Sequence, residues 1–412
     1  MPGMTARDWL VPAGAEAGAG LLLASRGLRG FADGFIAVLL PAYLQALGFS
    51  LVQIGLVGTL TLAGSAAATL AIGAFCHRAR ATTLMTGAAL LMMATGLGFA
   101  SVATFAPLAI VAFAGTLNPS AGDVSVFLPL EHARLAHSAG DADARTRLFA
   151  RYSLVGALSA ALGSLASAVP AWWVAHAGGS MPGALRAMFV VYAAVGAIVA
   201  LLYRRLHLSG SERARDAEAR PQPLGVSRAT VLRIAALFCV DSFAGGLVVN
   251  SLLALWLFER FGLSLAAAGQ FFFVAGLLTT ASLLIAPAVA RRIGLLNTMV
   301  FTHIPANLFL VAAALAPSLP WALALLFARS ALSQMDVPTR NAFVMAVVTP
   351  PERAAAASFT AVPRSLASAL GPTIGAALLA SGVLAAPLVA CGALKIGYDL
   401  SMLFMFRRHR TD

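Results

Sequence analysis

Four acidic residues interrupt long apolar segments of the sequence. They are Asp33, Asp123, Asp241 and Asp336. A charged side chain at the centre of a membrane-spanning helix costs about 2.5–3.5 kcal/mol on insertion scales. A carboxylate favours its neutral form when it is buried without a partner and its charged form when water reaches it. We therefore expect these acids to face an aqueous pathway, and we assign proton coupling to Asp33 and Asp241.

Two arginines precede the first of these acids at helical spacing. Arg26, Arg29 and Asp33 are spaced three and four residues apart, so they share one face of a helix. Arg29 and Asp33 can pair directly at this spacing. We expect Arg26 to lie at the membrane interface and Arg29 to lie deeper.

A second stripe of charge occurs near residue 336. Arg329, Asp336 and Arg340 are spaced seven and four residues apart on one face, and Pro338 removes a backbone hydrogen bond between them. The spacing predicts an ion pair between Asp336 and Arg340. Arg329 suits either an anionic group of a substrate or an acid on a facing helix.

Three more polar residues occur in apolar segments nearer the carboxy terminus. Lys395 and Asp399 are four residues apart, which predicts a mutually neutralising pair. For His303 we expect a packed or hydrogen-bonded imidazole rather than a proton carrier.

The composition is that of a membrane protein. Of the 412 residues 60% are hydrophobic and only 11% are charged, whereas a soluble domain carries about 25% charged residues. The net charge of +12 follows topology, because seventeen arginines fall in one set of alternate connections and two in the other. This asymmetry places the arginine-rich connections and both termini in the cytoplasm and excludes a nucleic-acid partner. The three cysteines have no metal-ligand spacing.

Apolar runs of membrane-spanning length recur along the whole chain. Six precede a charged connection and six follow it, near residues 18–47, 50–76, 82–103, 105–130, 148–175, 183–203, 229–258, 263–290, 296–316, 319–348, 354–381 and 385–406. We therefore predict an all-α membrane protein of twelve transmembrane helices. Its domains are a six-helix bundle over 1–203, a cytoplasmic linker over 204–228 and a second six-helix bundle over 229–412.

The two halves also resemble each other. GFSLVQIG (48–55) aligns without gaps with GLSLAAAG (262–269), and Arg78 aligns with Arg292 at the same offset of 214 residues. Asp123 aligns with Asp336 at an offset of 213. Such a duplication is expected of two bundles related by an axis along the membrane normal.

With six plus six helices, a central loop and arginines after the second and eighth helices, the chain resembles the major facilitator superfamily of secondary transporters. The loop signature of that family is G-x-x-x-D-[RK]-x-G-[RK]-[RK]. The first copy here runs from Gly73 to Arg80 with His77 at the acidic position, and the second keeps Arg292 and Gly294 but has Arg291 there. The resemblance therefore depends on architecture more than on the motif.

In that family the first, fourth, seventh and tenth helices line a central cavity. The resemblance implies a substrate cavity formed by Arg29, Asp33, Asn118, Asp123, Asp241, Asn250, Arg329 and Asp336. It also implies a cytoplasmic gate formed by Arg78, Arg292, Arg340, Arg353 and Arg364.

The implied function is secondary active transport of a small solute across a bacterial inner membrane by alternating access, coupled to protons, with export slightly favoured. The first alternative is an uptake symporter for an organic anion or zwitterion. The second is a membrane-embedded enzyme, which rests on His132, His137, Asp141 and Asp143 in one loop; their spacing fits no catalytic pattern. We expect a monomer without cofactor or metal, whose partners are its substrate, protons and the lipid bilayer.

Overall fold

The computed structural model describes residues 18–75, 80–120, 125–138, 142–209, 225–349 and 352–407. All secondary structure in these ranges is helical. The chain divides into two compact units. The first comprises Met1–Phe49, Leu60–Arg213 and Leu265–Phe273, and the second comprises Ser50–Thr59, Ala214–Ser264 and Val274–Asp412.

The first half of the chain forms eight α-helices and a short 3₁₀ helix among its described residues. They are α2 (Gly18–Ala46), α3 (Leu51–Phe75), α4 (Ala81–Ser101), α5 (Phe105–Ala114), α6 (Phe127–His137), α7 (Ala142–Leu165), η2 (Ala166–Ala168), α8 (Val169–Ala177) and α9 (Met181–Ser209).

The described residues of the second half form eight further helices. They are α10 (Arg228–Leu247), α11 (Asn250–Phe261), α12 (Leu265–Ile293), α13 (Leu295–Ala314), α14 (Leu319–Leu332), α15 (Asp336–Val347), α16 (Arg353–Ala380) and α17 (Ala386–Phe406).

These helices reproduce the twelve predicted segments. Nine helical spans among the described residues are long and apolar enough to cross a membrane. The other three segments are α5–α6 and α14–α15, each of which is divided into two shorter helices, and α16, where Ser, Thr and Arg364 interrupt the apolar residues. Breaks occur where the sequence weakens the helix, at Pro119 and at Ser333–Met335 just before Pro338.

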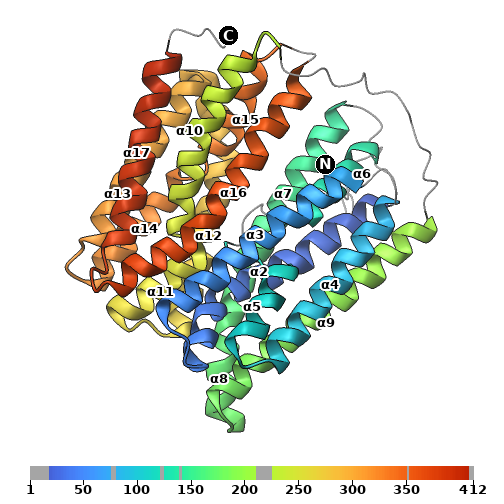
Figure 1. The fold of residues 1–412 in the computed structure, drawn as a ribbon, viewed down its shortest axis with the longest axis vertical. Coiled ribbons are helices and arrows are strands. Elements are labelled where there is room, and N and C mark those ends of the chain that lie inside the picture. Colours follow the sequence, from blue (N-terminus) through green and yellow to red (C-terminus); the bar gives the residue numbers. More distant parts are fainter. Residues whose placement is uncertain are drawn as a thin grey trace, which may run out of the picture. The chain divides into compact units, whose positions relative to one another are not determined.

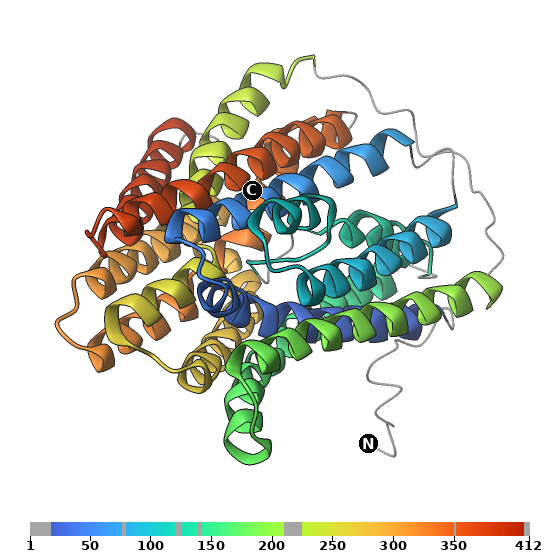
Figure 2. The same ribbon diagram turned by 60° about the horizontal axis from the view of Figure 1, so that its bottom comes forward.

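Small residues allow one pair of helices in each unit to pack closely. In the first unit α2 lies against α7, where a methyl group added to Gly34 would lie 2.0 Å from the carbonyl oxygen of Ala160. In the second unit α10 lies against α16, where a methyl group on Gly246 would lie 2.3 Å from the carbonyl oxygen of Ser368. Figure 1 shows α10 beside α16 and α17, and Figures 1 and 2 both show α4 running along α9. Only glycine permits these close approaches between backbones.

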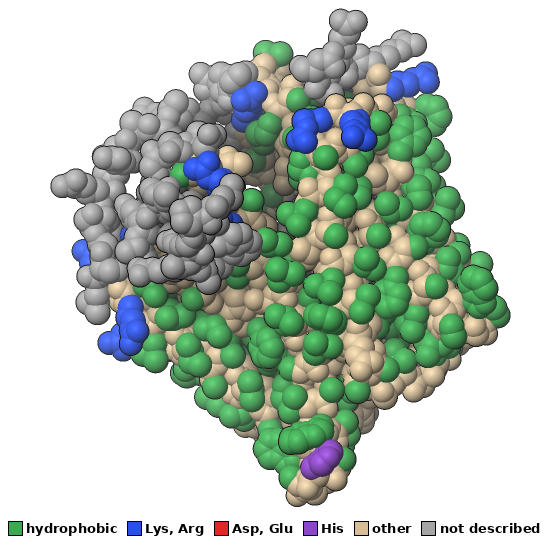
Figure 3. All heavy atoms as spheres, turned by 180° about the vertical axis from the view of Figure 1, so that it is seen from behind, with side chains coloured by type: hydrophobic (Ala, Val, Ile, Leu, Met, Phe, Trp, Pro, Cys, Tyr) green, Lys and Arg blue, Asp and Glu red, His purple; other side chains and the backbone are tan. Residues whose placement is uncertain are grey.

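The outer surfaces of the helices are suited to lipid. Large apolar side chains are exposed along them, among which Leu284, Phe301 and Phe404 are each more than half exposed. Figure 3 shows one face of the molecule, on which hydrophobic side chains predominate. This distribution is the one that a multi-pass membrane protein requires.

The start of α10 is held by a carboxylate from the connection between α15 and α16. Glu352 accepts hydrogen bonds of 3.0 Å from the backbone N–H groups of Gly225, Val226 and Ser227. The Ser227 side chain and these backbone groups lower the pKa of Glu352 below its ordinary value. The residue that precedes α16 therefore fixes the entry to the first helix of the second half.

Candidate functional site

A fully buried glutamate organises the polar centre of the first unit. Glu131 on α6 forms an ion pair with Arg29 on α2. Its carboxylate also accepts hydrogen bonds from the hydroxyls of Tyr152 on α7 and Tyr203 on α9, the latter at 2.6 Å. The guanidinium of Arg29 lies over the ring of Phe127, 4.1 Å from its centroid. Four helices are thus tied together through one carboxylate.

This arrangement corrects the predicted pair between Arg29 and Asp33. Arg29 forms its ion pair with Glu131 instead. The carboxylate of Glu131 also accepts hydrogen bonds from two tyrosine hydroxyls. Glu131 is not among the predicted site residues, because the polar stretch that follows it is typical of a loop. Its one signal was its place at the end of an apolar segment.

Asp33 lies one turn beyond Arg29 on α2 and is 7% exposed. Asn118 donates a hydrogen bond to it, and Arg29 and Arg26 are its charged neighbours. Arg26 itself is buried, with its guanidinium 5.2 Å from the ring centroid of Tyr152. Asp33 thus lies next to positive charge while Arg29 is engaged elsewhere.

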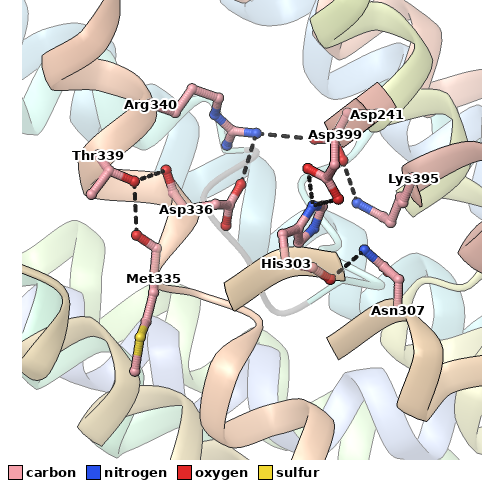
Figure 4. A network of polar contacts seen from close by, with 9 residues as sticks. All are labelled: Asp241, His303, Asn307, Met335, Asp336, Thr339, Arg340, Lys395 and Asp399. Atoms are coloured by element: carbon pink, nitrogen blue, oxygen red, sulfur yellow. Dashed lines mark hydrogen bonds and ion pairs between the residues drawn. The ribbon is translucent and has the colours of Figure 1, made fainter. Parts of the chain in front are cut away.

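The second unit contains a larger charged network, which Figure 4 shows. Asp241 on α10 binds two cations, Lys395 Nζ on α17 at 2.6 Å and Arg340 on α15 at 3.0 Å. Arg340 also binds Asp336 at 3.3 Å, which confirms the ion pair predicted from their spacing. All four residues are at least nine-tenths buried. A buried charge is stable only when it is paired in this way.

The network continues to α13. The Nδ1 atom of His303 lies 3.0 Å from both carboxylate oxygens of Asp399 on α17. His303 is therefore hydrogen-bonded, as predicted. The predicted pair between Lys395 and Asp399 is wrong, because the lysine reaches across to Asp241 and leaves Asp399 to the histidine.

Apolar packing positions this network. Phe238, Met299, Phe343 and Met402 come from α10, α13, α15 and α17 and belong to one buried cluster. The same four helices carry Asp241, His303, Arg340 and Lys395. The charged groups are thus held by a rigid apolar core rather than by loops.

The remaining predicted cavity residues are not members of these ion pairs, and one of them lies outside the described ranges. Asn118 is buried and accepts a 2.7 Å hydrogen bond from Ser120, and Asn250 is the first residue of α11. Arg329 on α14 is half-buried, its Nε has no hydrogen-bond partner among the described residues, and the ionisable neighbour that acts on it is Cys391. Asp123 lies outside the described residues.

The described members of the predicted gate differ in burial and in partners. Arg340 belongs to the buried network, whereas Arg292 and Arg353 are exposed and Arg353 donates to the carbonyl of Met345 at 3.1 Å. Arg364 on α16 is partly exposed and has Arg340 as a charged neighbour. Arg78 lies outside the described residues.

One crevice adjoins the charged network. It has a volume of about 370 Å³ and lies between α12, α13 and α15, where Pro287, Leu295 and Thr339 contribute to its lining. Among the described residues no group of three or more His, Cys, Asp or Glu side chains could hold a metal ion.

The sequence and the fold both point to one family. The family model of the Major Facilitator Superfamily matches residues 22–372. The chain belongs to the major facilitator superfamily. It is accordingly a multi-pass membrane transporter of a small molecule rather than an enzyme, and its fold is two pseudo-symmetric bundles of six helices.

Relatives of known sequence or structure agree with this assignment. The chain is 24% identical to the uncharacterized membrane protein YJR124C of Saccharomyces cerevisiae, over 94% of this chain and 93% of that protein. A crystal structure of a mutant of the nucleoside transporter NupG matches with a TM-score of 0.74 and 17% identity, over 94% of this chain and all of that one. A bacterial homologue of the human lysosomal transporter Spinster matches with a TM-score of 0.69 and 18% identity, over 95% of this chain and 96% of that one. These structural likenesses concern the fold alone.

Proposed function

We propose that this member of the superfamily is a proton-coupled secondary transporter in which Asp33 carries the proton. The observation behind the proposal is the difference between its two candidate coupling acids. Asp241 is bonded to two cations, at 2.6 and 3.0 Å. Asp33 has a hydrogen bond from Asn118, while Arg29, one turn away on the same helix, is engaged by Glu131. Of the two acids, Asp241 is held in two ion pairs, whereas the bonded partner of Asp33 is an uncharged amide.

Opposing influences act on the charge of Asp33. Burial disfavours the carboxylate, while the positive charges of Arg26 and Arg29 favour it. A change in hydration or in the distance to these arginines would therefore bind or release a proton. Alternating access to the two sides of the membrane supplies such a change, since each opening exposes the site to a different aqueous phase.

Arg329 supports a second candidate, the uptake of an organic anion or zwitterion. Its Nε is buried without a hydrogen-bond partner among the described residues, and the ionisable side chain that acts on it is a thiol. An arginine presents a planar set of donors that fits a carboxylate or phosphate in a bidentate manner. A substrate with such a group would satisfy it. In this second candidate the proton moves inward with the anion.

For the direction we propose export, from the cytoplasm across a bacterial inner membrane. The excess of arginine in one set of connections supports cytoplasmic termini, both of which lie outside the described residues. Alkaline phosphatase fused after Asp412 should be inactive in the periplasm of a bacterial host. An active fusion would contradict the assignment of the carboxy terminus to the cytoplasm.

The function is tested with the purified protein in proteoliposomes that contain a pH-sensitive dye. Uridine, dialanine and succinate are added as probes of nucleoside, peptide and organic-anion transport, with and without an imposed pH gradient. We expect at least one class of solute to move protons and to accumulate only under the gradient. Accumulation that is indifferent to the gradient would exclude proton coupling. Succinate as the solute that moves inward with protons would favour the second candidate over export.

A further inference from the structure

We propose that His303 and Asp399 form a proton-binding site whose occupancy decides which carboxylate Lys395 binds. With the proton bound, the pair is an imidazolium and a carboxylate, and Lys395 binds Asp241 as in the structure. When the proton leaves, the imidazole is neutral, and the ammonium of Lys395 turns to Asp399. The proposal deepens the proposed coupling and places a second proton site on α13 and α17. It departs from the expectation that His303 is not a proton carrier.

The charges of the network favour this assignment. Asp241 and Asp336 contribute two negative charges, and Arg340 and Lys395 contribute two positive ones that are bonded to them. The network is therefore balanced without the histidine pair. Asp399 is 1% exposed and His303 is 5% exposed. Loss of the imidazolium proton leaves the buried carboxylate of Asp399 without a counter-charge, and this carboxylate then attracts a cation that can move to it.

Lys395 is that cation, and it can reach either acid. Its Nζ atom lies 2.6 Å from Asp241 in the structure, and Asp399 follows it by one helical turn on α17. Residues at this spacing are neighbours on the helix surface and can form an ion pair. Four methylene groups separate the ammonium from the backbone, so the exchange requires only rotation of the side chain. The pair of Lys395 with Asp399, which their spacing predicts, and the pair of Lys395 with Asp241, which the structure contains, are then the two states of one switch.

Asp241 tolerates the departure of the lysine because it keeps a second partner. Arg340 remains bonded to it at 3.0 Å and bridges it to Asp336. The switch therefore leaves no bare carboxylate in either state. When the proton is absent, the ion pair that joins α10 to α17 is therefore lost. One carboxylate oxygen of Asp241 on α10 is then without its lysine partner.

Other charged groups from the surrounding helices set the balance between the two states. They are Asp241 on α10, Asp336 and Arg340 on α15, Arg364 on α16, and Lys395 and Tyr398 on α17. The ring of Tyr398 lies edge-on to His303 with the centroids 6.2 Å apart. Arg364 is partly exposed and has Arg340, Asp241 and Asp336 as charged neighbours.

A property of the sequence makes the switch directly observable. Lys395 is the only lysine in the chain. Protein that is grown with ¹³C-labelled lysine and placed in nanodiscs gives one lysine side-chain signal by NMR. We expect this signal to move with a single midpoint when the pH is varied from about 5 to about 8, where an imidazole can change its charge.

Two variants should fix the signal at opposite ends of that titration. His303→Gln cannot hold the imidazolium, so the signal should stay at its high-pH position at every pH. Asp399→Asn removes the second carboxylate, so the signal should stay at its low-pH position. His176→Gln replaces an exposed histidine on α8 and is the control. The lysine signal of this variant should move with pH as it does in the unaltered protein.

A lysine signal that does not move with pH, or one that still titrates in both His303→Gln and Asp399→Asn, would overturn the proposal. Because the measurement contains no substrate and no gradient, its outcome is independent of whether Asp33 couples transport.

Discussion

Lys395 on α17 binds Asp241 on α10 across 2.6 Å, although Asp399 lies one turn away on its own helix. The bond joins two helices that are distant in sequence but packed together in the second unit. Because both groups are buried, each depends on the other for its charge to be tolerated.

Removal of the lysine should therefore destabilise the protein more than removal of both charges. Lys395→Met leaves Asp241 with Arg340 as its remaining cation, and we expect a loss of up to about 3 kcal/mol, the lower end of the range for a broken buried pair. The double variant Asp241→Asn with Lys395→Met should recover part of that loss. Thermal unfolding in detergent measures both. A double variant that is less stable than Lys395→Met would contradict the pairing.

Glu131 should be the most sensitive acid of the first unit. Glu131→Gln leaves the buried Arg29 without its counter-charge, for which about 3–5 kcal/mol is expected. Tyr203→Phe removes a single hydrogen bond to a charged group and should cost about 1.5–3 kcal/mol. Unfolding temperatures of the two variants, compared in the same detergent, should preserve this order. Equal stability of Glu131→Gln and the unaltered protein would show that the glutamate is not the centre of the cluster.

The close approach of α10 to α16 predicts a steric effect at one glycine. Gly246→Ala would bring a methyl group to 2.3 Å from the Ser368 carbonyl oxygen, so the helices must separate and stability must fall. Gly397→Ala is the matched control, because nothing lies within 4 Å of its added methyl group and alanine favours the helix by about 0.5–1 kcal/mol. Opposite shifts in unfolding temperature are expected. A shift in the same direction at both positions would argue against the close packing.

The bonds to Glu352 predict a dependence of stability on acidity. Its folded pKa is lowered below the ordinary value of about 4.5, so its stabilising effect is present above that value and is lost as the pH falls through the folded pKa. Glu352→Gln should therefore unfold at a lower temperature than the unaltered protein at pH 7, and the difference should shrink below about pH 4. Glu259→Gln controls for the loss of a carboxylate elsewhere. A constant difference at every pH would assign the effect to packing.

Much of the fold could be predicted because a membrane constrains the sequence directly. A spanning helix needs about 20 apolar residues, and each predicted segment corresponds to one helix or to consecutive helices of the described residues. The breaks themselves follow from local residues such as Pro119 and Pro338, which remove backbone donors.

The partners of the buried charges could not be predicted in the same way. Spacing along one helix indicates which residues share a face, and it correctly paired Asp336 with Arg340. It cannot show when a partner on another helix competes, which is why Arg29 binds Glu131 and Lys395 binds Asp241. Those choices depend on how helices pack, and that packing depends on residues without a side chain, such as Gly34 and Gly246.

The most direct test of the proposed coupling is transport by Asp33→Asn in proteoliposomes, with the solute that the unaltered protein accumulates. Equilibrium exchange of labelled solute and accumulation driven by a pH gradient are measured on the same preparation, with His176→Gln as the control. We predict that Asp33→Asn retains exchange and loses gradient-driven accumulation. Accumulation at the rate of the unaltered protein would contradict the assignment of the proton to Asp33.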